Sequence, residues 1–350
     1  MRILILVSSL EIGGAQKQAV LDANMLATSQ TVYFGMFAGG GLLDQVDDAV
    51  HQVTFQKDNY WSTAGRIAQF VKEHDIQLIH NHLYAPMLIS ALASLRTPVP
   101  VLWHFHGHHF EVRRWPLNLL SQMPTVKQLI FVCSALADYF GREYYFPAKK
   151  RTVVYNSTEC TQQPTLRPND ATLRIGFMGR IVGLKRVQYL VRLAAFLRDQ
   201  ELTNFEVLIA GDGPERAALE ALAEQEGVSD CVRFLGFRSD LEYLYNQMDL
   251  FILPSEEEAL SLALIDASNC GLPCLAFDVG GNKEIVIDGQ TGYIVHSEEE
   301  LRQRAYQLCQ DANLRQSLGE QAKQYAQIFG EQQHRQRLLE IYSQYVGSTE

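Results

Sequence analysis

A loop that follows a predicted buried strand carries two cations that could bind phosphate. The strand Leu173–Met178 leads into Gly179 and Arg180, and Lys185 follows just before a helix-compatible stretch. Fixed cations and the exposed N–H groups at a helix start bind anions, and they stabilise a departing negative charge. The loop therefore predicts a diphosphate site, with an ordinary solvated basic loop as the alternative.

Two carboxylates follow another predicted strand, Leu250–Leu253. Glu258 ends a run of three acids, and Asp266 comes eight residues later inside an otherwise apolar stretch. An acid in an apolar helix needs a partner or a ligand. Because carboxylates accept hydrogen bonds and sugar hydroxyls donate them, we expect a hydroxylated ligand here. A polar helix entry with one solvated face is the plainer interpretation.

Histidines are concentrated in the first half of the chain and alternate along two predicted strands. They are His80, His82, His104, His106, His108 and His109. Neutral imidazoles on one face at strand ends could hold zinc. No cysteine or acidic cluster accompanies them in the sequence, and no D-x-D pair occurs anywhere. We therefore expect no metal site.

A basic and partly apolar patch is predicted in residues 113–123, which combine Arg113, Arg114 and Trp115 with several leucines. Lys127 and the run 149–151 add further cations. Such a patch can rest on an anionic membrane surface. A helix that packs its apolar side into the core and begins with cations explains the same residues.

These side chains require an alternation of strands and helices to position them. Short apolar runs are unbroken by polar residues and suit strands buried on both faces; between several of them lie helix-compatible stretches such as 15–27, 62–74 and 85–94. The predicted strands are 3–7, 32–37, 76–80, 99–104, 129–133, 153–155, 173–178, 205–210, 232–235, 250–253 and 273–277. This pattern predicts α/β domains with doubly wound parallel sheets. Gly13 and Gly14 then open a helix after the first strand, where the backbone can approach an anion.

The polar stretch 161–172, with its prolines, divides the chain into two predicted domains. We expect a first domain over 1–160, a linker over 161–172 and a second domain over 173–330. Residues 331–350 are expected to form a C-terminal helix that can pack back on the first domain. A ligand shared between two such domains would lie outside the carboxyl ends of their strands.

Composition excludes several classes of protein. The chain has 350 residues, 47% of them hydrophobic, which suits a globular protein of about two domains. Apolar runs are too short for a membrane-spanning helix, and the six scattered cysteines suggest neither a disulfide framework nor a zinc site, in keeping with the reducing cytoplasm. The net charge of −10 disfavours nucleic acid as a partner. Lys and Arg balance Asp and Glu through residue 160 (13 against 12), whereas the remainder carries 17 against 28.

In order and spacing, these motifs resemble retaining glycosyltransferase family 4, the glycosyl transferases group 1, over nearly the whole chain. Gly179-Arg180 with Lys185 resembles its G-R-x4-K, and Glu258 with Asp266 resembles its E-x7-E, with Asp in place of the second Glu. Further matches are Gly13-Gly14-Ala15, His106-Gly107, Ala210 to Pro214, Val232 to Phe237, Val279-Gly280-Gly281 and Gly289 to Gly292. The resemblance implies the GT-B fold, in which two Rossmann-like domains face each other across a cleft.

The resemblance also implies a role for each matching residue. Arg180 and Lys185 would hold the diphosphate of a nucleotide-sugar donor, and Glu258 would accept hydrogen bonds from the donor sugar. Asp266 would bind the ribose, and Leu262 would lie with it in the donor site. Gly14 would let the first domain close on the phosphate, His106 would lie beside the sugar and the acceptor, and Phe237 would pack on the nucleobase.

A sugar transferase is therefore the function that the resemblance implies. The donor would be a nucleotide diphosphate-sugar and the acceptor a carbohydrate or lipid-linked glycan, with retention of configuration and without a metal ion. The enzyme would be cytoplasmic or peripheral at the inner face of the membrane. Two alternatives are a nucleotide-sugar 2-epimerase, which shares the fold, and a catalytically silent subunit that binds nucleotide-sugar for a partner.

Overall fold

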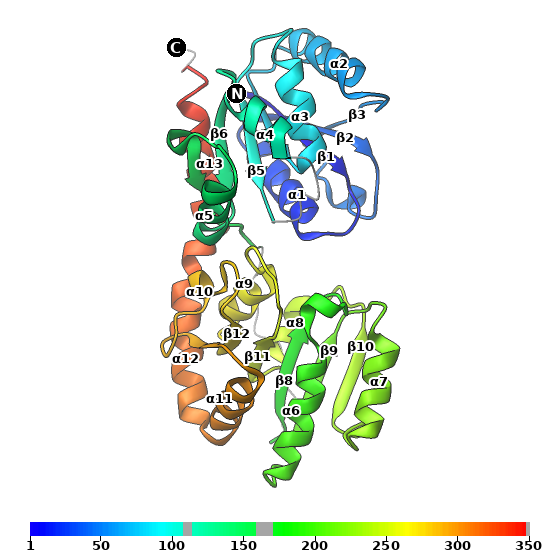
Figure 1. Cartoon of the computed structure of the whole chain (residues 1–350), viewed down its shortest axis with the longest axis vertical. Coiled ribbons are helices and arrows are strands. Elements are labelled where there is room, and N and C mark those ends of the chain that lie inside the picture. The colour runs from blue at the N-terminus through cyan, green and yellow to red at the C-terminus, as the bar shows by residue number, and fades with distance from the viewer. Residues whose placement is uncertain (108–113, 159–170, 348–350) are drawn as a thin grey trace. The chain divides into compact units, whose positions relative to one another are not determined.

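The computed structural model describes residues 1–107, 114–158 and 171–347. The chain forms two compact units (Figure 1). Unit 1 comprises residues 1–157 together with 331–350, and unit 2 comprises residues 158–330. Of the predicted linker, residues 161–170 lie outside the described part of the chain.

Unit 1 is built on one parallel sheet of seven strands in the order β3-β2-β1-β4-β5-β6-β7. Its strands are β1 (Arg2–Ser9), β2 (Thr31–Ala38), β3 (His51–Thr54), β4 (Leu78–His82), β5 (Val101–Phe105), β6 (Val126–Phe131) and β7 (Arg151–Val153). Its helices are α1 (Gly14–Ala27), α2 (Tyr60–Glu73), α3 (Tyr84–Ala93), α4 (Arg114–Ser121), α5 (Ser134–Glu143) and α13 (Glu331–Ser343).

The core of unit 1 joins the two ends of the chain. Helices α1 and α13 pack on one face of the sheet, where their apolar side chains meet alternate residues of the strands, such as Ile3, Ile5 and Val7 of β1. Leu78 of β4 and Leu102 of β5 belong to this same face. Side chains alternate along a strand. His80 and His82, which follow Leu78 on β4, and His104, which follows Leu102 on β5, therefore point toward the same two helices.

Unit 2 has a six-stranded parallel sheet in the order β10-β9-β8-β11-β12-β13. Its strands are β8 (Leu173–Met178), β9 (Phe205–Ala210), β10 (Val232–Gly236), β11 (Leu250–Leu253), β12 (Cys274–Phe277) and β13 (Gly292–Val295). Its helices are α6 (Gln188–Asp199), α7 (Arg216–Gln225), α8 (Leu241–Asn246), α9 (Leu262–Asn269), α10 (Asn282–Ile285), α11 (Glu298–Gln310) and α12 (Ala312–Tyr325).

The predicted doubly wound α/β architecture is confirmed in both units. The strand order reverses between β1 and β4 in unit 1 and between β8 and β11 in unit 2. In sheets of this kind, ligands bind beyond the carboxyl ends of the strands at such a reversal. Three strands (β8, β9 and β11) have the predicted bounds, whereas β4 and β6 are displaced by two or three residues and the sequence analysis missed the short strands β3 and β13.

Candidate functional site

The predicted phosphate loop lies at the carboxyl end of β8. Gly179 and Arg180 follow the strand directly, and a single 3-10 turn over Gly183–Lys185 leads toward α6. Arg186 closes this turn in the left-handed conformation, with φ of 46°. The Arg180 side chain is exposed, and Lys185 is half-buried. The loop therefore exposes the Arg180 cation to solvent and keeps the Lys185 cation partly buried.

Lys185 and Glu258 form an ion pair across the strand reversal. The Lys185 Nζ and Glu258 Oε1 atoms are 2.5 Å apart, and the side chains are 22% and 12% exposed. Lys185 belongs to the loop after β8 and Glu258 to the loop after β11, which are neighbouring strands. The structure thus brings together, in unit 2, the lysine predicted to bind a diphosphate and the glutamate predicted to bind a sugar.

Two further contacts hold the same loops together. An Arg186 guanidinium nitrogen lies 2.7 Å from a carboxylate oxygen of Glu256. The backbone N–H of Glu256 donates to the carbonyl of Leu184, also at 2.7 Å. Because Leu184 and Arg186 flank Lys185, these contacts position the Lys185–Glu258 pair from both sides.

The turn after β12 packs against the backbone of Glu258 and requires glycine. Gly280 has φ of 51°, and a Cβ atom there would lie 2.0 Å from the Glu258 carbonyl oxygen. The N–H of Gly281 donates to the Ala259 carbonyl at 2.7 Å. A side chain at Gly280 would therefore displace the segment that carries the candidate sugar-binding carboxylate.

The other candidate donor-binding residues of unit 2 lie on the same edge of its sheet. Leu262 is the first residue of α9, and Asp266 lies one turn farther along; both are half-buried. Ser261 caps this helix by accepting a hydrogen bond from the Leu264 N–H at 3.4 Å. Phe237 directly follows β10, which β9 separates from β8, and its side chain is 69% exposed.

In unit 1, Gly14 and His106 lie beyond the carboxyl ends of β1 and β5. Gly14 is the exposed first residue of α1, a helix with no side-chain cap and no acidic residue in its first turn. His106 is half-buried, and its Nε2 atom is 2.8 Å from Nδ1 of His82. The structure thus places His106 against a second histidine, a partner that the resemblance does not imply.

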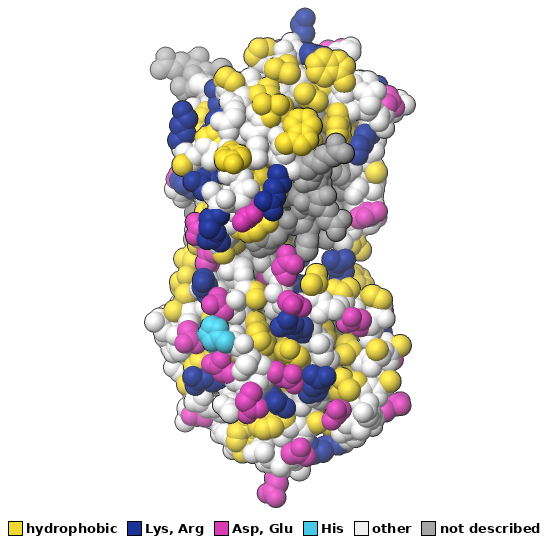
Figure 2. All heavy atoms as spheres, viewed as in Figure 1, with side chains coloured by type: hydrophobic (Ala, Val, Ile, Leu, Met, Phe, Trp, Pro, Cys, Tyr) yellow, Lys and Arg dark blue, Asp and Glu magenta, His cyan; other side chains and the backbone are white. Residues whose placement is uncertain are grey.

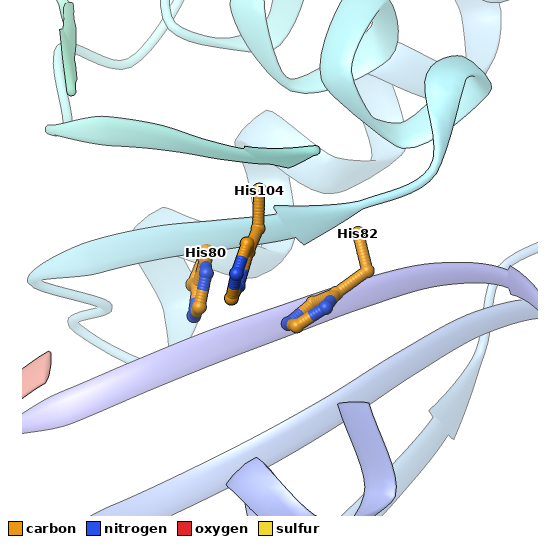
Figure 3. A group of neighbouring side chains, drawn as sticks. All are labelled: His80, His82 and His104. Atoms are coloured by element: carbon orange, nitrogen blue, oxygen red, sulfur yellow. The ribbon is translucent and has the colours of Figure 1, made fainter. Parts of the chain in front are cut away.

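His80, His82 and His104 form a buried cluster with His106. The three are fully buried on β4 and β5, and each offers a ring nitrogen within 4.8 Å of the others (Figure 3). The His104 and His106 rings are also close, with centroids 4.3 Å apart. His108 and His109 lie outside the described residues, so the grouping of His104 and His106 with His108 stays a hypothesis of the sequence alone.

Sequence reasoning missed Asp22 and His334, two charged residues that border this cluster. Asp22 of α1 is fully buried, and its Oδ1 atom lies 2.7 Å from Nε2 of His334 on α13. Gln18 also donates to that oxygen, at 2.7 Å. The Oδ2 atom of Asp22 is 3.7 Å from Nε2 of His82. The only signal in the sequence was the i, i+4 spacing of Gln18 and Asp22 in a helix that is otherwise apolar on that side.

Burial and charge shift the pKa values of this group in opposite directions. Burial lowers the pKa of His80 to about 4 and that of His106 to about 3, and it holds those of His82 and His104 well below their usual value. Burial also opposes ionisation of Asp22 and His334, but their mutual attraction outweighs it, so the pKa of Asp22 is lowered. That of His334 is raised in turn. Asp22 and His334 are thus a buried ion pair beside neutral imidazoles.

The basic patch is partly engaged within the fold. Lys150 donates to the carbonyls of Ser121 and Met123 at 2.7 and 2.9 Å, and burial lowers its pKa. Arg114 pairs with Glu143 at 2.8 Å. By contrast, Trp115 and Leu119 of α4 are each 62% exposed. In the described residues, no helix is long and apolar enough to cross a membrane.

Comparison with known families gives two adjoining matches. Residues 31–162 match the family model described as Glycosyltransferase Family 4, and residues 161–325 match the one described as Glycosyl transferases group 1. The chain is 35% identical over 307 residues to N-acetyl-alpha-D-glucosaminyl L-malate synthase of Bacillus anthracis, which covers 78% of each chain. A putative glycosyltransferase of Bacillus subtilis, EpsD, is 28% identical and covers 80% of each.

Solved structures share the fold over almost the entire chain. A glycosyltransferase from Rickettsia africae superposes with a TM-score of 0.88 at 19% identity, covering 99% of each chain. HepE of Anabaena, solved with UDP and glucose, superposes with a TM-score of 0.84 at 22% identity, covering 98% of this chain and all of that one. The architecture of the two parallel sheets is therefore that of the GT-B glycosyltransferases.

Proposed function

The chain belongs to the glycosyl transferases group 1 of glycosyltransferase family 4, and on this premise we propose that it transfers a sugar from a nucleoside diphosphate-sugar to a carbohydrate or glycolipid acceptor with retention of anomeric configuration. It is a glycosyltransferase of glycan synthesis. The donor, the stereochemistry and the roles of individual residues are the parts that we propose.

The Lys185–Glu258 ion pair is the observation that carries the proposal. A cation suited to phosphate and a carboxylate suited to hydroxyl groups lie 2.5 Å apart at the strand reversal. A nucleotide-sugar carries both phosphate and hydroxyl groups, so it can contact both side chains at once. With the donor bound, Lys185 and the exposed Arg180 stabilise the charge that develops on the departing diphosphate. Glu258 accepts hydrogen bonds from the sugar. Leu262 and Asp266 on α9 contact the nucleoside, and Phe237 packs on its base.

Retention follows from a reaction on one face of the sugar. The bond from the acceptor oxygen to the anomeric carbon forms on the side from which the diphosphate leaves, and the leaving phosphate oxygen takes the acceptor proton. Glu258 is engaged by Lys185, and an ion-paired carboxylate is a poor nucleophile. Positioning and electrostatic stabilisation are then the contributions of the protein, with Gly14 admitting the phosphate and His106 beside the acceptor.

The donor step needs no metal ion in this proposal. Arg180 and Lys185 supply the positive charge that Mg²⁺ supplies to diphosphates elsewhere. Both are fixed to the loop after β8, so the charge is in place before the donor binds.

A lipid-linked acceptor would bring the protein to the cytoplasmic face of a membrane through unit 1. Trp115 and Leu119 lie one helical turn apart on α4, and both are largely exposed. On the face of unit 1 seen in Figure 2, apolar side chains lie beside Lys and Arg side chains. Flotation with anionic vesicles should fall on replacing Trp115 and Leu119 with Ala. It should persist in a Trp61→Ala control, whose side chain is 56% exposed on α2. Equal flotation of both variants would contradict the contact.

A panel of nucleotide-sugars tests the function. UDP-N-acetylglucosamine and UDP-glucose are the first donors to try, with product anomers assigned by NMR and acceptors ranging from sugars to small hydroxy acids. We expect donor consumption coupled to a new glycosidic bond of unchanged configuration. Interconversion of donors without transfer would indicate an epimerase, and binding without turnover would indicate a silent subunit; either result contradicts the proposal.

A further inference from the structure

The buried histidine cluster leaves several polar atoms without a hydrogen-bond partner among the described residues. On His80, His82, His104 and Asp22 these atoms are His80 Nε2, His82 Nε2, both ring nitrogens of His104 and Asp22 Oδ2; Nδ1 of the adjoining His106 is a further one. All four side chains are fully buried. A buried polar atom without a partner destabilises the folded state, and more so when it is charged. Such a concentration in one place calls for a ligand that satisfies several donor atoms at once.

The four side chains converge on one another from three elements. His82 of β4 and His104 of β5 are paired residues of neighbouring strands, and His80 lies on the same face of β4. Figure 3 shows the three rings gathered on one side of the ribbon, with the His82 ring pointing toward the other two. Ring nitrogens of the three lie within 4.8 Å of one another, and Asp22 Oδ2 is 3.7 Å from His82 Nε2. Tetrahedral zinc holds its ligand atoms about 3.3 Å apart, since each lies at about 2.0–2.1 Å from the ion. The spacing in the structure is wider than this, and Asp22 lies outside the group of three mutually close ring nitrogens, so binding of an ion must draw the four side chains closer together.

In three of these four side chains, the other polar atom is held by a residue that is not one of the four. His80 Nδ1 is 2.7 Å from the Tyr342 hydroxyl on α13, and His82 Nδ1 is 2.8 Å from His106 Nε2. Asp22 Oδ1 accepts hydrogen bonds from Gln18 and pairs with His334. Metal-binding histidines and carboxylates are held in this way, with one atom on the ion and the other in an outer hydrogen bond that orients it.

From this geometry we infer that His80, His82, His104 and Asp22 bind one divalent transition-metal ion, with Zn²⁺ best matched to three imidazoles and a carboxylate. Neutral imidazoles are the form that binds metal, and burial keeps these rings neutral. The sequence argument against a metal was that no cysteine or acidic cluster accompanies the histidines and that no D-x-D pair occurs. Asp22 supplies an acid from α1, far away in the chain.

The ion would link α1 and α13, the helices from the two ends of the chain, to His106 on the candidate acceptor side. It joins α1, β4 and β5 directly, and it reaches α13 through Tyr342 and His334. With the metal on Nε2, His82 must carry its proton on Nδ1 and donate it to Nε2 of His106. His106 then keeps its own proton on Nδ1. The site thereby orients His106, and it is separate from Arg180, Lys185 and Glu258, the charged donor-binding candidates of unit 2.

Metal analysis of the full chain, purified without a histidine tag, tests the site. We expect about one Zn²⁺ per chain, retained through gel filtration, and about one in ten of that amount or less in His104→Gln. Metal-free protein should rise in thermal midpoint by about 5 °C with excess Zn²⁺ and not with Mg²⁺. His51→Gln is the matched control, because His51 is an exposed histidine on β3 of the same unit.

Substitution with Co²⁺ provides the second measurement, and it does not depend on whether the variants fold. A tetrahedral nitrogen and oxygen site gives strong visible absorption that saturates at one Co²⁺ per chain. Absence of bound zinc, of that absorption and of any thermal shift would overturn the inference and leave hydrogen-bonded water in the cluster. Equal metal content in His104→Gln and His51→Gln would overturn it as well, by locating the metal elsewhere.

Discussion

Nζ of Lys185 and Oε1 of Glu258 are 2.5 Å apart, and the two residues follow neighbouring strands, β8 and β11, on opposite sides of the strand reversal. The resemblance assigns one of them to phosphate and the other to sugar, as independent contacts. Their pairing makes them interdependent, because removal of either leaves the other half-buried without its opposite charge. The ion pair holds both side chains in position for the donor, and donor binding must replace part of this interaction.

Replacing Lys185 with Ala should lower turnover about 100-fold or more, as does the loss of other groups that stabilise developing charge. Arg180→Ala should have an effect of the same order. Because Lys185 also pairs with Glu258, the double variant Lys185→Ala, Glu258→Gln should lose less than the sum of the single losses in activation free energy. Steady-state kinetics on the wild type, Lys185→Ala, Glu258→Gln and the double variant measure the coupling. Near-normal turnover in Lys185→Ala and Arg180→Ala would contradict the diphosphate assignment.

Glu258→Gln should lower activity strongly while the protein stays folded, because Gln keeps the shape and removes the charge that accepts from sugar hydroxyls. Glu206→Gln is the control. Glu206 is a partly buried, ion-paired carboxylate at the amino end of β9, on the opposite edge of the same sheet. Circular dichroism and turnover should be measured together. If Glu258→Gln unfolds while its remaining native fraction is fully active, the carboxylate has a structural role only.

Gly280→Ala should reduce turnover about tenfold or more, because the added Cβ would lie 2.0 Å from the Glu258 carbonyl oxygen. Gly289→Ala separates this clash from simple backbone strain. Gly289 also has positive φ, 70°, but nothing lies within 4 Å of its Cβ position. The control should lose about 1 kcal/mol of stability and little activity. Equal kinetic effects of the two substitutions would show that the close approach does not position Glu258.

In metal-free protein, His334→Ala should lower the free energy of unfolding by about 3–5 kcal/mol, because it leaves the buried Asp22 carboxylate without a positively charged partner. Urea unfolding is the measurement. Arg335→Ala, at the next residue of α13, removes only an exposed hydrogen bond to Ser29 at 2.7 Å and should change stability by about 0.5 kcal/mol or less. If His334→Ala is as stable as Arg335→Ala, Asp22 is not held as an ion by His334.

Transfer should proceed at the same rate without added Mg²⁺ or Mn²⁺ as with either ion at millimolar concentration, because Arg180 and Lys185 provide the positive charge at the donor. Initial rates after brief exposure to EDTA should also be unchanged, since a buried histidine cluster would release its ion slowly. A rate that depends on an added divalent ion would place a metal at the diphosphate.

Local patterns in the sequence predicted the α/β fold, and they singled out the candidate residues of the donor side. Buried parallel strands such as β8, β9 and β11 are continuous apolar runs, so their bounds can be predicted from the residues themselves. Each donor motif likewise lies within one strand, loop and helix unit, so Arg180, Lys185 and Glu258 could be singled out without a structure. The edge strands β3 and β13 could not, because His51–Thr54 is mostly polar and exposed and Gly292–Val295 has only three apolar residues in a row.

Tertiary structure alone decided which side chains meet. Lys185 and Glu258 lie in the loops after β8 and β11 and form an ion pair. Nothing in either sequence motif predicts that the two side chains pair with each other. In the sequence, Asp22 is only one polar position in a helix; its role is visible once α1 packs over β1, β2 and β4. His334 lies near the other end of the chain and reaches Asp22 only because α13 returns to unit 1. Burial then shifts the pKa values and leaves the histidine nitrogens unpartnered, and burial is a property of the packed elements rather than of any one segment.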